Sequence, residues 1–244
     1  MGGQANTNST LGSSNFDGSR QATTKVNTTS GFSIISWTGT GSAFTLGHGL
    51  GVAPKVYIVK ARTGSSGCDW FVYHKEIGAT HNLRLNNTSA SGAASDLFNN
   101  TEPTSSVLSI GDSSCINENN GTYITYAFSE VAGYSKFGKY TGNGSSDGPF
   151  VFTGFTPRWI LLKCSGSTGN WVLIDTERPS GGNFINYNTL SPNLNSAENS
   201  SGGVTNDILS NGFKLRGSTD RNINGQQHIY LAFAESPFKN ARAR

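Results

Sequence analysis

The chain has 244 residues, enough for one large or two small domains, and its net charge is only +3. A charge this small and scattered argues against a nucleic-acid-binding protein. No run of about 18 apolar residues occurs, so membrane insertion is not expected either. The 31 glycines, together with many Ser, Thr and Asn residues, instead favour short strands joined by tight turns.

Residues 1–29 form a polar leader that is rich in Gly, Ser, Asn and Thr. Only Leu11, Phe16 and Val26 offer apolar side chains for burial, so the segment alone would not offset the entropy lost on ordering. We therefore predict a flexible linker, or an assembly arm that becomes ordered against a partner chain. Its first residues also lack the basic and apolar regions of a secretion signal.

The first unit, residues 30–133, reads as a series of short strands between turns rich in Gly and Asn. No window shows convincing helical periodicity, although residues 90–98 have the length for one or two helical turns. The predicted strands are Phe32–Thr38, Lys55–Ala61, Trp70–His74, Asn82–Asn86, Ser106–Ile110 and Thr122–Glu130.

The second unit, residues 134–244, repeats the pattern of the first. Tyr140-Thr-Gly-x-Gly matches Trp37-Thr-Gly-x-Gly, and Pro157 and Pro54 follow these motifs at the same spacing. The repeat therefore predicts a tandem duplication. The predicted strands are Phe150–Thr153, Arg158–Cys164, Trp171–Asp175, Asn183–Tyr187, Gly212–Arg216 and His228–Glu235.

Six or seven short strands per unit indicate an all-β fold rather than alternating strands and helices. We predict two tandem, similar β-sandwich units of jelly-roll-like form behind a short extended N-terminal arm. Matched aromatic residues such as Trp70 and Trp171 are expected to pack in the cores.

The three cysteines, Cys68, Cys115 and Cys164, are an odd number at unrelated spacings. They indicate neither a zinc site nor a disulfide framework, and we expect reduced thiols. The four histidines show no pairing with each other or with a cysteine at metal-ligand spacing. The sequence therefore predicts no metal and no cofactor.

A catalytic carboxylate pair is the remaining enzymatic possibility. Glu130 and Glu235 end equivalent strands of the two units, so we expect them about a domain apart, with Lys60 and Lys163 as possible ion-pair partners. The chain also lacks a nucleophile elbow, a His-Glu-x-x-His motif and a phosphate-binding loop. We predict no catalytic residue and no enzymatic activity.

Several longer strings resemble a known family. They are Gly47–Lys55, Trp70–Lys75, Gly133–Gly144, Asp147–Pro157 and Ala232–Lys239. Over about residues 30–244 the chain resembles the repeat module at the C-terminal end of tail-fibre and related virion proteins of marine bacteriophages. The resemblance implies a virion structural protein without catalytic residues, often trimeric and assembled in the host cytoplasm. In that family the module often follows a longer shaft than the roughly 29 residues that precede it here.

We therefore predict a tail fibre or surface appendage of the virion that attaches to the host surface. Its partners would be two further copies in a homotrimer, other tail or capsid proteins, and a host-surface glycan bound by loops of the second unit. These loops span residues 165–169, 179–183 and 195–203. The candidate receptor contacts are Ser165, Ser167, Asn170, Asn183, Asn195 and Asn199.

Two other functions stay open. A capsid decoration or tail cement protein would lay residues 1–29 across neighbouring subunits. A glycan depolymerase would require an acid/base pair, which the sequence does not offer.

Overall fold

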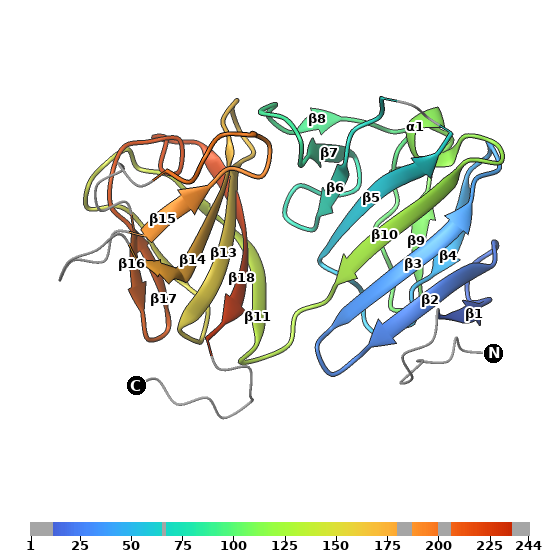
Figure 1. Cartoon of the computed structure of the whole chain (residues 1–244), viewed down its shortest axis with the longest axis horizontal. Helices are drawn as coiled ribbons and strands as arrows, with labels where there is room; N and C mark the ends of the chain where they lie inside the picture. The colour runs from blue at the N-terminus through green and yellow to red at the C-terminus, as the bar shows by residue number, and fades with distance from the viewer. Residues whose placement is uncertain (1–11, 65–66, 180–186, 200–205, 236–244) are drawn as a thin grey trace. The chain divides into compact units, whose positions relative to one another are not determined.

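The computed structural model describes residues 12–64, 67–179, 187–199 and 206–235 (Figure 1). These residues form strands and turns, and α1 (Ser114–Asn117) is the one helix among them. The predicted all-β fold is confirmed. Contacts within the chain define two compact units: Met1–Arg84 with Ser91–Glu130, and Leu85–Ala90 with Val131–Arg244. The sequence predicts a boundary after residue 133, which lies close to this division. It does not predict that residues 85–90 belong to the second unit.

The first unit is a two-layered β-sandwich. Its strands are β1 (Ser13–Asn15), β2 (Ala22–Asn27), β3 (Phe32–Thr38), β4 (Phe44–Gly47), β5 (Val56–Thr63), β6 (Phe71–His74), β7 (His81–Arg84), β8 (Gly92–Ala93), β9 (Val107–Ile110) and β10 (Thr122–Phe128). The large sheet has the order β1-β2-β3-β10-β5-β6-β7-β8, and β4 pairs with β9 in a smaller sheet (Figure 1). Ile35 and Val59 of the large sheet share one core with Leu46 and Leu108 of the small sheet.

Alternating side chains explain why β3 and β10 lie at the centre of the large sheet. Buried and half-buried residues alternate along the whole of both strands, because successive side chains of a strand point to opposite faces. On the core face, the Trp37 ring stacks on Tyr123 with the ring centroids 5.4 Å apart. This alternation leaves a second face of the sheet, opposite the core, on which the candidate site lies.

The second unit is built on the same plan. Its strands are β11 (Ser135–Thr141), β12 (Phe150–Phe152), β13 (Pro157–Cys164), β14 (Trp171–Pro179), β15 (Tyr187–Leu190), β16 (Asn206–Leu209), β17 (Gly212–Leu215) and β18 (Gln227–Ala234). The larger sheet has the order β11-β18-β13-β14-β15 and the smaller β12-β17-β16. Ile160 and Tyr230 of the larger sheet pack in one core with Phe213 of the smaller.

The two large sheets share a strand order. The segment β3-β10-β5-β6-β7 of the first sheet corresponds in chain order and pairing to β11-β18-β13-β14-β15 of the second. Trp37 on Tyr123 in the first unit is matched by Tyr140 on His228 in the second, with centroids 5.0 Å apart. The tandem duplication itself stays a prediction from the sequence.

A buried asparagine occupies the same turn in each unit. Asn117 Oδ1 accepts a hydrogen bond from the Thr40 N–H at 2.8 Å, and its Nδ2 donates to the carbonyls of Ser42 and Gly111 at 2.8 and 2.6 Å. In the second unit, the side chain of Asn222 does the same. It accepts from the Asn143 N–H at 2.9 Å and donates to the carbonyls of Ser145 and Gly217 at 2.9 and 2.7 Å.

The N-terminal leader is the main correction to the predicted fold. Residues 13–15 and 22–27 were expected in a linker or arm, but they form β1 and β2 and extend the large sheet beyond β3. Ala22, Thr24 and Val26 are buried while their neighbours are exposed. Because small and hydroxyl-bearing residues fill the inward positions, the segment carries too few large apolar side chains to be recognised as a strand.

Smaller differences concern strand limits. The structure adds β4, β11 and β16, which the sequence did not single out, and it has a short strand and turns where residues 90–98 were considered for helical turns. Of the predicted strand at residues 183–187, all but Tyr187 lies outside the described residues, and β15 begins at Tyr187.

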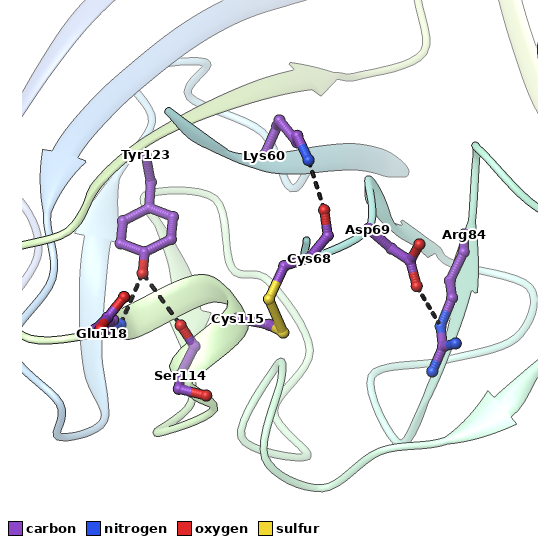
Figure 2. The surroundings of a disulfide bond; sticks show 8 residues. All are labelled: Lys60, Cys68, Asp69, Arg84, Ser114, Cys115, Glu118 and Tyr123. Atoms are coloured by element: carbon purple, nitrogen blue, oxygen red, sulfur yellow. Dashed lines mark hydrogen bonds and ion pairs between the residues drawn. A yellow bond between two sulfur atoms is a disulfide. The ribbon is translucent and has the colours of Figure 1, made fainter. Parts of the chain in front are cut away.

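A disulfide between Cys68 and Cys115 contradicts the prediction of reduced thiols. The two residues are 47 positions apart, and the chain brings Cys68, just after β5, against Cys115 of α1 (Figure 2). Lys60 Nζ donates to the Cys68 carbonyl at 2.5 Å, and Tyr123 Oη donates to the Ser114 carbonyl at 3.2 Å. The disulfide therefore joins two segments that the sheet already holds close together. Cys164 is a free, buried thiol.

Candidate functional site

A polar hollow of about 540 Å³ lies in the first unit where β2, β3, β5 and β10 come together. It is lined mainly by hydroxyl groups, an amide and two guanidinium groups. These polar lining residues are Ser19, Arg20, Gln21, Thr23, Ser36, Thr38, Arg62 and Thr122. The buried residues Ala22, Trp37 and Tyr123 complete the lining.

The floor of the hollow is the face of the large sheet opposite the core. Ser36 and Thr38 alternate along β3 with the buried Trp37, so their hydroxyl groups face away from the core. Thr122 of β10 is the register partner of Thr38, and Thr23 of β2 is the partner of Ser36. Four hydroxyl-bearing side chains are thus set in two cross-strand pairs on one regular sheet.

The N-terminal segment forms one wall. Hydrogen bonds to β4 fix its backbone: the Arg20 N–H donates to the Thr45 carbonyl at 3.1 Å, and the Ser19 N–H donates to Thr45 Oγ1 at 2.9 Å. Gln21 Nε2 donates to Ser14 Oγ of the adjacent strand at 3.0 Å. The Arg20 side chain, which is exposed, therefore projects from a backbone held by the sandwich itself.

Arg62 reaches the hollow from a β-bulge. Tyr123 pairs with Ala61 and Thr122 pairs with Thr63, so Arg62 is an extra residue in β5. A bulge of this kind changes the direction of a side chain relative to a regular strand. Beyond it, Thr63 Oγ1 lies 2.7 Å from Thr122 Oγ1 and accepts the Thr122 N–H at 3.1 Å, which secures the end of the bulge.

The hollow carries uncompensated positive charge. Within the described part of the chain, no carboxylate lines it, and neither Arg20 nor Arg62 takes part in an ion pair. An arginine side chain offers five N–H donors in a planar fork that suits carboxylate and related oxyanions. Chemically, the site can bind an anionic group beside a set of hydroxyl groups.

The six receptor contacts predicted in the second unit do not form one exposed surface. Ser165 is only 3% exposed, and its hydroxyl donates to the Gln227 carbonyl at 3.1 Å, so the prediction of a surface contact is wrong for this residue. Ser167 Oγ is half-buried and lies 3.2 Å from the Cys164 sulfur. Asn183 lies outside the described residues.

Residues that flank two of the predicted loops, 165–169 and 195–203, are in contact. Asn193 Nδ2 donates to Asn170 Oδ1 at 2.8 Å, and Asn193 Oδ1 accepts the Trp171 N–H at 2.9 Å. This contact links the loop that ends at Asn170 to the one that contains Asn195. Asn195 and Asn199 are exposed, and the backbone of Asn199 pairs with Thr189. Asn170 therefore serves to connect loops, whereas Asn195 and Asn199 lie at the surface.

The ion pairs considered for Lys60 and Lys163 are not the bonds found. Lys60 Nζ donates to the Cys68 carbonyl, and Lys163 Nζ donates to the carbonyls of Thr88 and Gly169 at 3.0 and 2.7 Å. Burial lowers the pKa of Lys163 to about 8. Glu235 instead lies 3.9 Å from Arg158. The two lysines thus hold equivalent loops by hydrogen bonds to backbone carbonyls.

No motif or spacing in the sequence indicates the hollow. Its residues come from four separated stretches, and isolated arginines and threonines match no motif. The bulge at Arg62 follows from the register of β5 against β10, which the sequence alone does not determine.

The residues that the structure describes contain no cluster of three or more metal-ligating side chains. None of the helices among them has the length and apolar character that a membrane span requires.

Comparison with protein families identifies the family of this chain. The model of a family described as a domain of unknown function, DUF7483, matches residues 5–237, which includes both units. No curated protein and no solved structure matches the chain significantly.

Proposed function

The chain belongs to the family of the domain of unknown function DUF7483. We propose that it is a non-enzymatic structural protein of a bacteriophage particle that attaches to the host surface. The assignment to a phage particle rests on the resemblance of its repeat strings, such as Gly133–Gly144 and Asp147–Pro157, to tail-fibre modules. A tail fibre or surface appendage is the proposed location.

The observation that carries the attachment function is the hollow on the first large sheet. Its hydroxyl groups and its two arginines, Arg20 and Arg62, stand on strands and on a backbone segment bonded to β4. A site on such a rigid scaffold loses little conformational entropy when it binds. Concave surfaces with a few well-placed polar groups are typical of ligand sites.

Two further features support a role outside a cell. Disulfides such as Cys68–Cys115 persist mainly in oxidising surroundings. The shared strand order of the two units and the matched bonds of Asn117 and Asn222 support a duplicated module, an arrangement suited to an appendage. We propose that three chains assemble, so that weak contacts at several copies add through effective concentration.

The test is attachment of the purified full-length chain to host cells. The protein is coupled at high density to fluorescent beads, and beads with an unrelated β-sandwich protein serve as the control. We expect specific bead attachment that soluble protein competes away. Equal attachment of both bead types would contradict the proposal, and new reducing ends in host polysaccharide would indicate a depolymerase instead.

The second candidate function is capsid decoration or tail cementing through an N-terminal arm. Residues 13–15 and 22–27 are strands of the first sheet, so they are not available as a free arm. A truncation should therefore remove residues 1–11 only and leave β1 and β2 intact. A cement protein would lose its association with particles after this truncation, whereas an attachment protein would still bind cells.

A further inference from the structure

We infer that the hollow of the first unit binds an acidic saccharide, a sugar carrying a carboxylate or sulfate group, with Arg20 and Arg62 as the donors to its anionic group. The inference rests on the proposed function in attachment and names the class of ligand. It places the site in the first unit, not in the second-unit loops that the sequence favoured.

The dimensions of the hollow suit a small sugar. Its volume of about 540 Å³ lies within the range of roughly 300–1,000 Å³ that is typical of small-ligand sites. The site sits on the face opposite the core, among exposed and half-buried side chains, so the end of a longer glycan can enter without displacing the core.

The charge of the hollow selects for an anion. Arg20 and Arg62 approach from different stretches of the chain, one from the N-terminal wall and the other from the bulge in β5. Neither forms an ion pair with a described residue, so binding an anion does not require breaking one. Hydrogen bonds from guanidinium to an oxyanion are among the stronger ones in proteins, and they are often bidentate.

The hydroxyl groups select for a sugar rather than a simple ion. The side chains of Thr23, Ser36 and Thr38 make no hydrogen bond with any other described residue, and each hydroxyl can both donate and accept. Sugar hydroxyls have the same capacity, so a row of Ser and Thr side chains on one sheet face matches them. Within the described residues, the two guanidinium groups and these three hydroxyl groups are thus available to one ligand, whereas the hydroxyls of Ser19 and Thr122 are bonded to Thr45 and Thr63.

Comparison of the two units shows what creates the site. The equivalent sheet of the second unit begins with β11, and among the residues that the structure describes no strands there correspond to β1 and β2. Arg62 follows Ala61, the partner of Tyr123, and the corresponding residue of the second unit is Ser165, which follows Cys164, the partner of His228. Ser165 is buried and bonded to Gln227. The second unit therefore serves as an internal negative control, and we expect a single site of this kind in each chain.

The experiment measures binding of defined oligosaccharides to the full-length chain by titration calorimetry. The probes are a trisaccharide of uronic acid, a sulfated trisaccharide and a neutral trisaccharide of the same linkage. The variants are Arg20→Gln, Arg62→Gln and the double variant. Lys25→Gln is the matched control, because Lys25 is an exposed cation of β2 outside the hollow.

We expect one site per chain for at least one acidic probe, and the stronger of the two identifies the acid group. Each arginine substitution should weaken binding by about tenfold or more, as expected for losing a hydrogen bond to a charged group. Lys25→Gln should change it by less than about twofold, in line with a screened surface charge. Unchanged melting temperatures would show that the variants are folded.

Three results would overturn the inference: equal binding of neutral and acidic probes, equal binding by the double variant, or displacement of the acidic probe by an equimolar oligonucleotide. Bead attachment to cells separates this failure from failure of the proposed function. If wild-type and double-variant beads attach equally, attachment stands and the hollow is not its site. If wild-type beads do not attach at all, the proposed function itself fails, while calorimetry still reports on the hollow.

Discussion

Asn117 and Asn222 hold the same turn in the two units through the same set of backbone hydrogen bonds. Each side chain is almost completely buried, accepts one N–H and donates to two carbonyls. The carbonyls of the two asparagines also accept the N–H groups of Gly41 and Gly144. Each amide side chain therefore supplies hydrogen-bond partners to backbone groups of the turn that are not paired in a sheet.

Substitution Asn117→Ala should destabilise the first unit. Three backbone groups would lose their partner, one in a buried hydrogen bond and two in partly buried ones. Because the loss at a fully buried group costs about 1–3 kcal/mol and the partly buried groups lose less, we expect about 2 kcal/mol or more in total. Urea unfolding followed by tryptophan fluorescence measures the change. Asn119→Ala, at an exposed neighbouring position, is the control and should cost less than about 0.5 kcal/mol. Similar losses for both variants would contradict a specific role of Asn117.

Removal of the Cys68–Cys115 disulfide should also destabilise the first unit. Closing a loop with a sequence separation of 47 is expected to contribute about 2–4 kcal/mol, mainly by restricting the unfolded chain. Unfolding of a Cys68→Ser, Cys115→Ser variant should match that of the wild type in reducing agent. Thiol labelling of the denatured, unreduced wild type should modify Cys164 alone, and modification of three cysteines would show that the bond is absent.

The lowered pKa of Lys163 should make the free energy of unfolding increase at alkaline pH. Its pKa is about 8 in the folded chain and 10.5 in its ordinary state, so between these values the unfolded chain holds more protons. Stability increases with pH wherever the unfolded state binds more protons. The free energy of unfolding of the wild type, measured relative to Lys163→Met, should therefore increase from pH 8 to pH 10.5. A flat difference over this window would contradict the shifted pKa.

The lowered pKa of Glu102 should make the free energy of unfolding decrease at acidic pH. Burial alone would raise the pKa of Glu102, but hydrogen bonds from Tyr73, Lys75 and the Ala79 N–H lower it overall. A carboxylate with a lowered pKa stabilises the fold above its ordinary pKa of 4.5, and the contribution is lost as the pH falls below that value. The stability difference between the wild type and Glu102→Gln should shrink between pH 5 and pH 3. Its persistence at pH 3 would contradict this role.

The sequence predicts the central strands well, because they are short apolar runs, rich in β-branched and aromatic residues or Leu, between segments of turn residues. Val56–Lys60 and its counterpart at 159–163 are examples, and both lie in strands of the structure. A strand such as β2, whose inward positions include Ala and Thr, is not predicted in this way. Its alternating burial is seen in the structure, but its sequence does not show a matching alternation of apolar residues. Element type is therefore easier to predict than the extent of a sheet.

The site was harder to predict than the fold. Arg20 and Arg62 are distant in the chain, and they come to one hollow only through the pairing of β2 with β3 and through a bulge in β5. Ser165 is predicted as a receptor contact because its loop is rich in Ser and Gly, but its hydroxyl donates to the Gln227 carbonyl inside the protein. The disulfide likewise depends on where β5 ends relative to α1.

The hairpin of β1 and β2 lies outside the strand order common to both units, yet it carries the wall of the hollow. Under the proposed function, ligand preference depends on this hairpin as well as on Arg62 of the repeated body. Chimaeras that exchange residues 12–27 with another member of the family should therefore alter which ligand is bound.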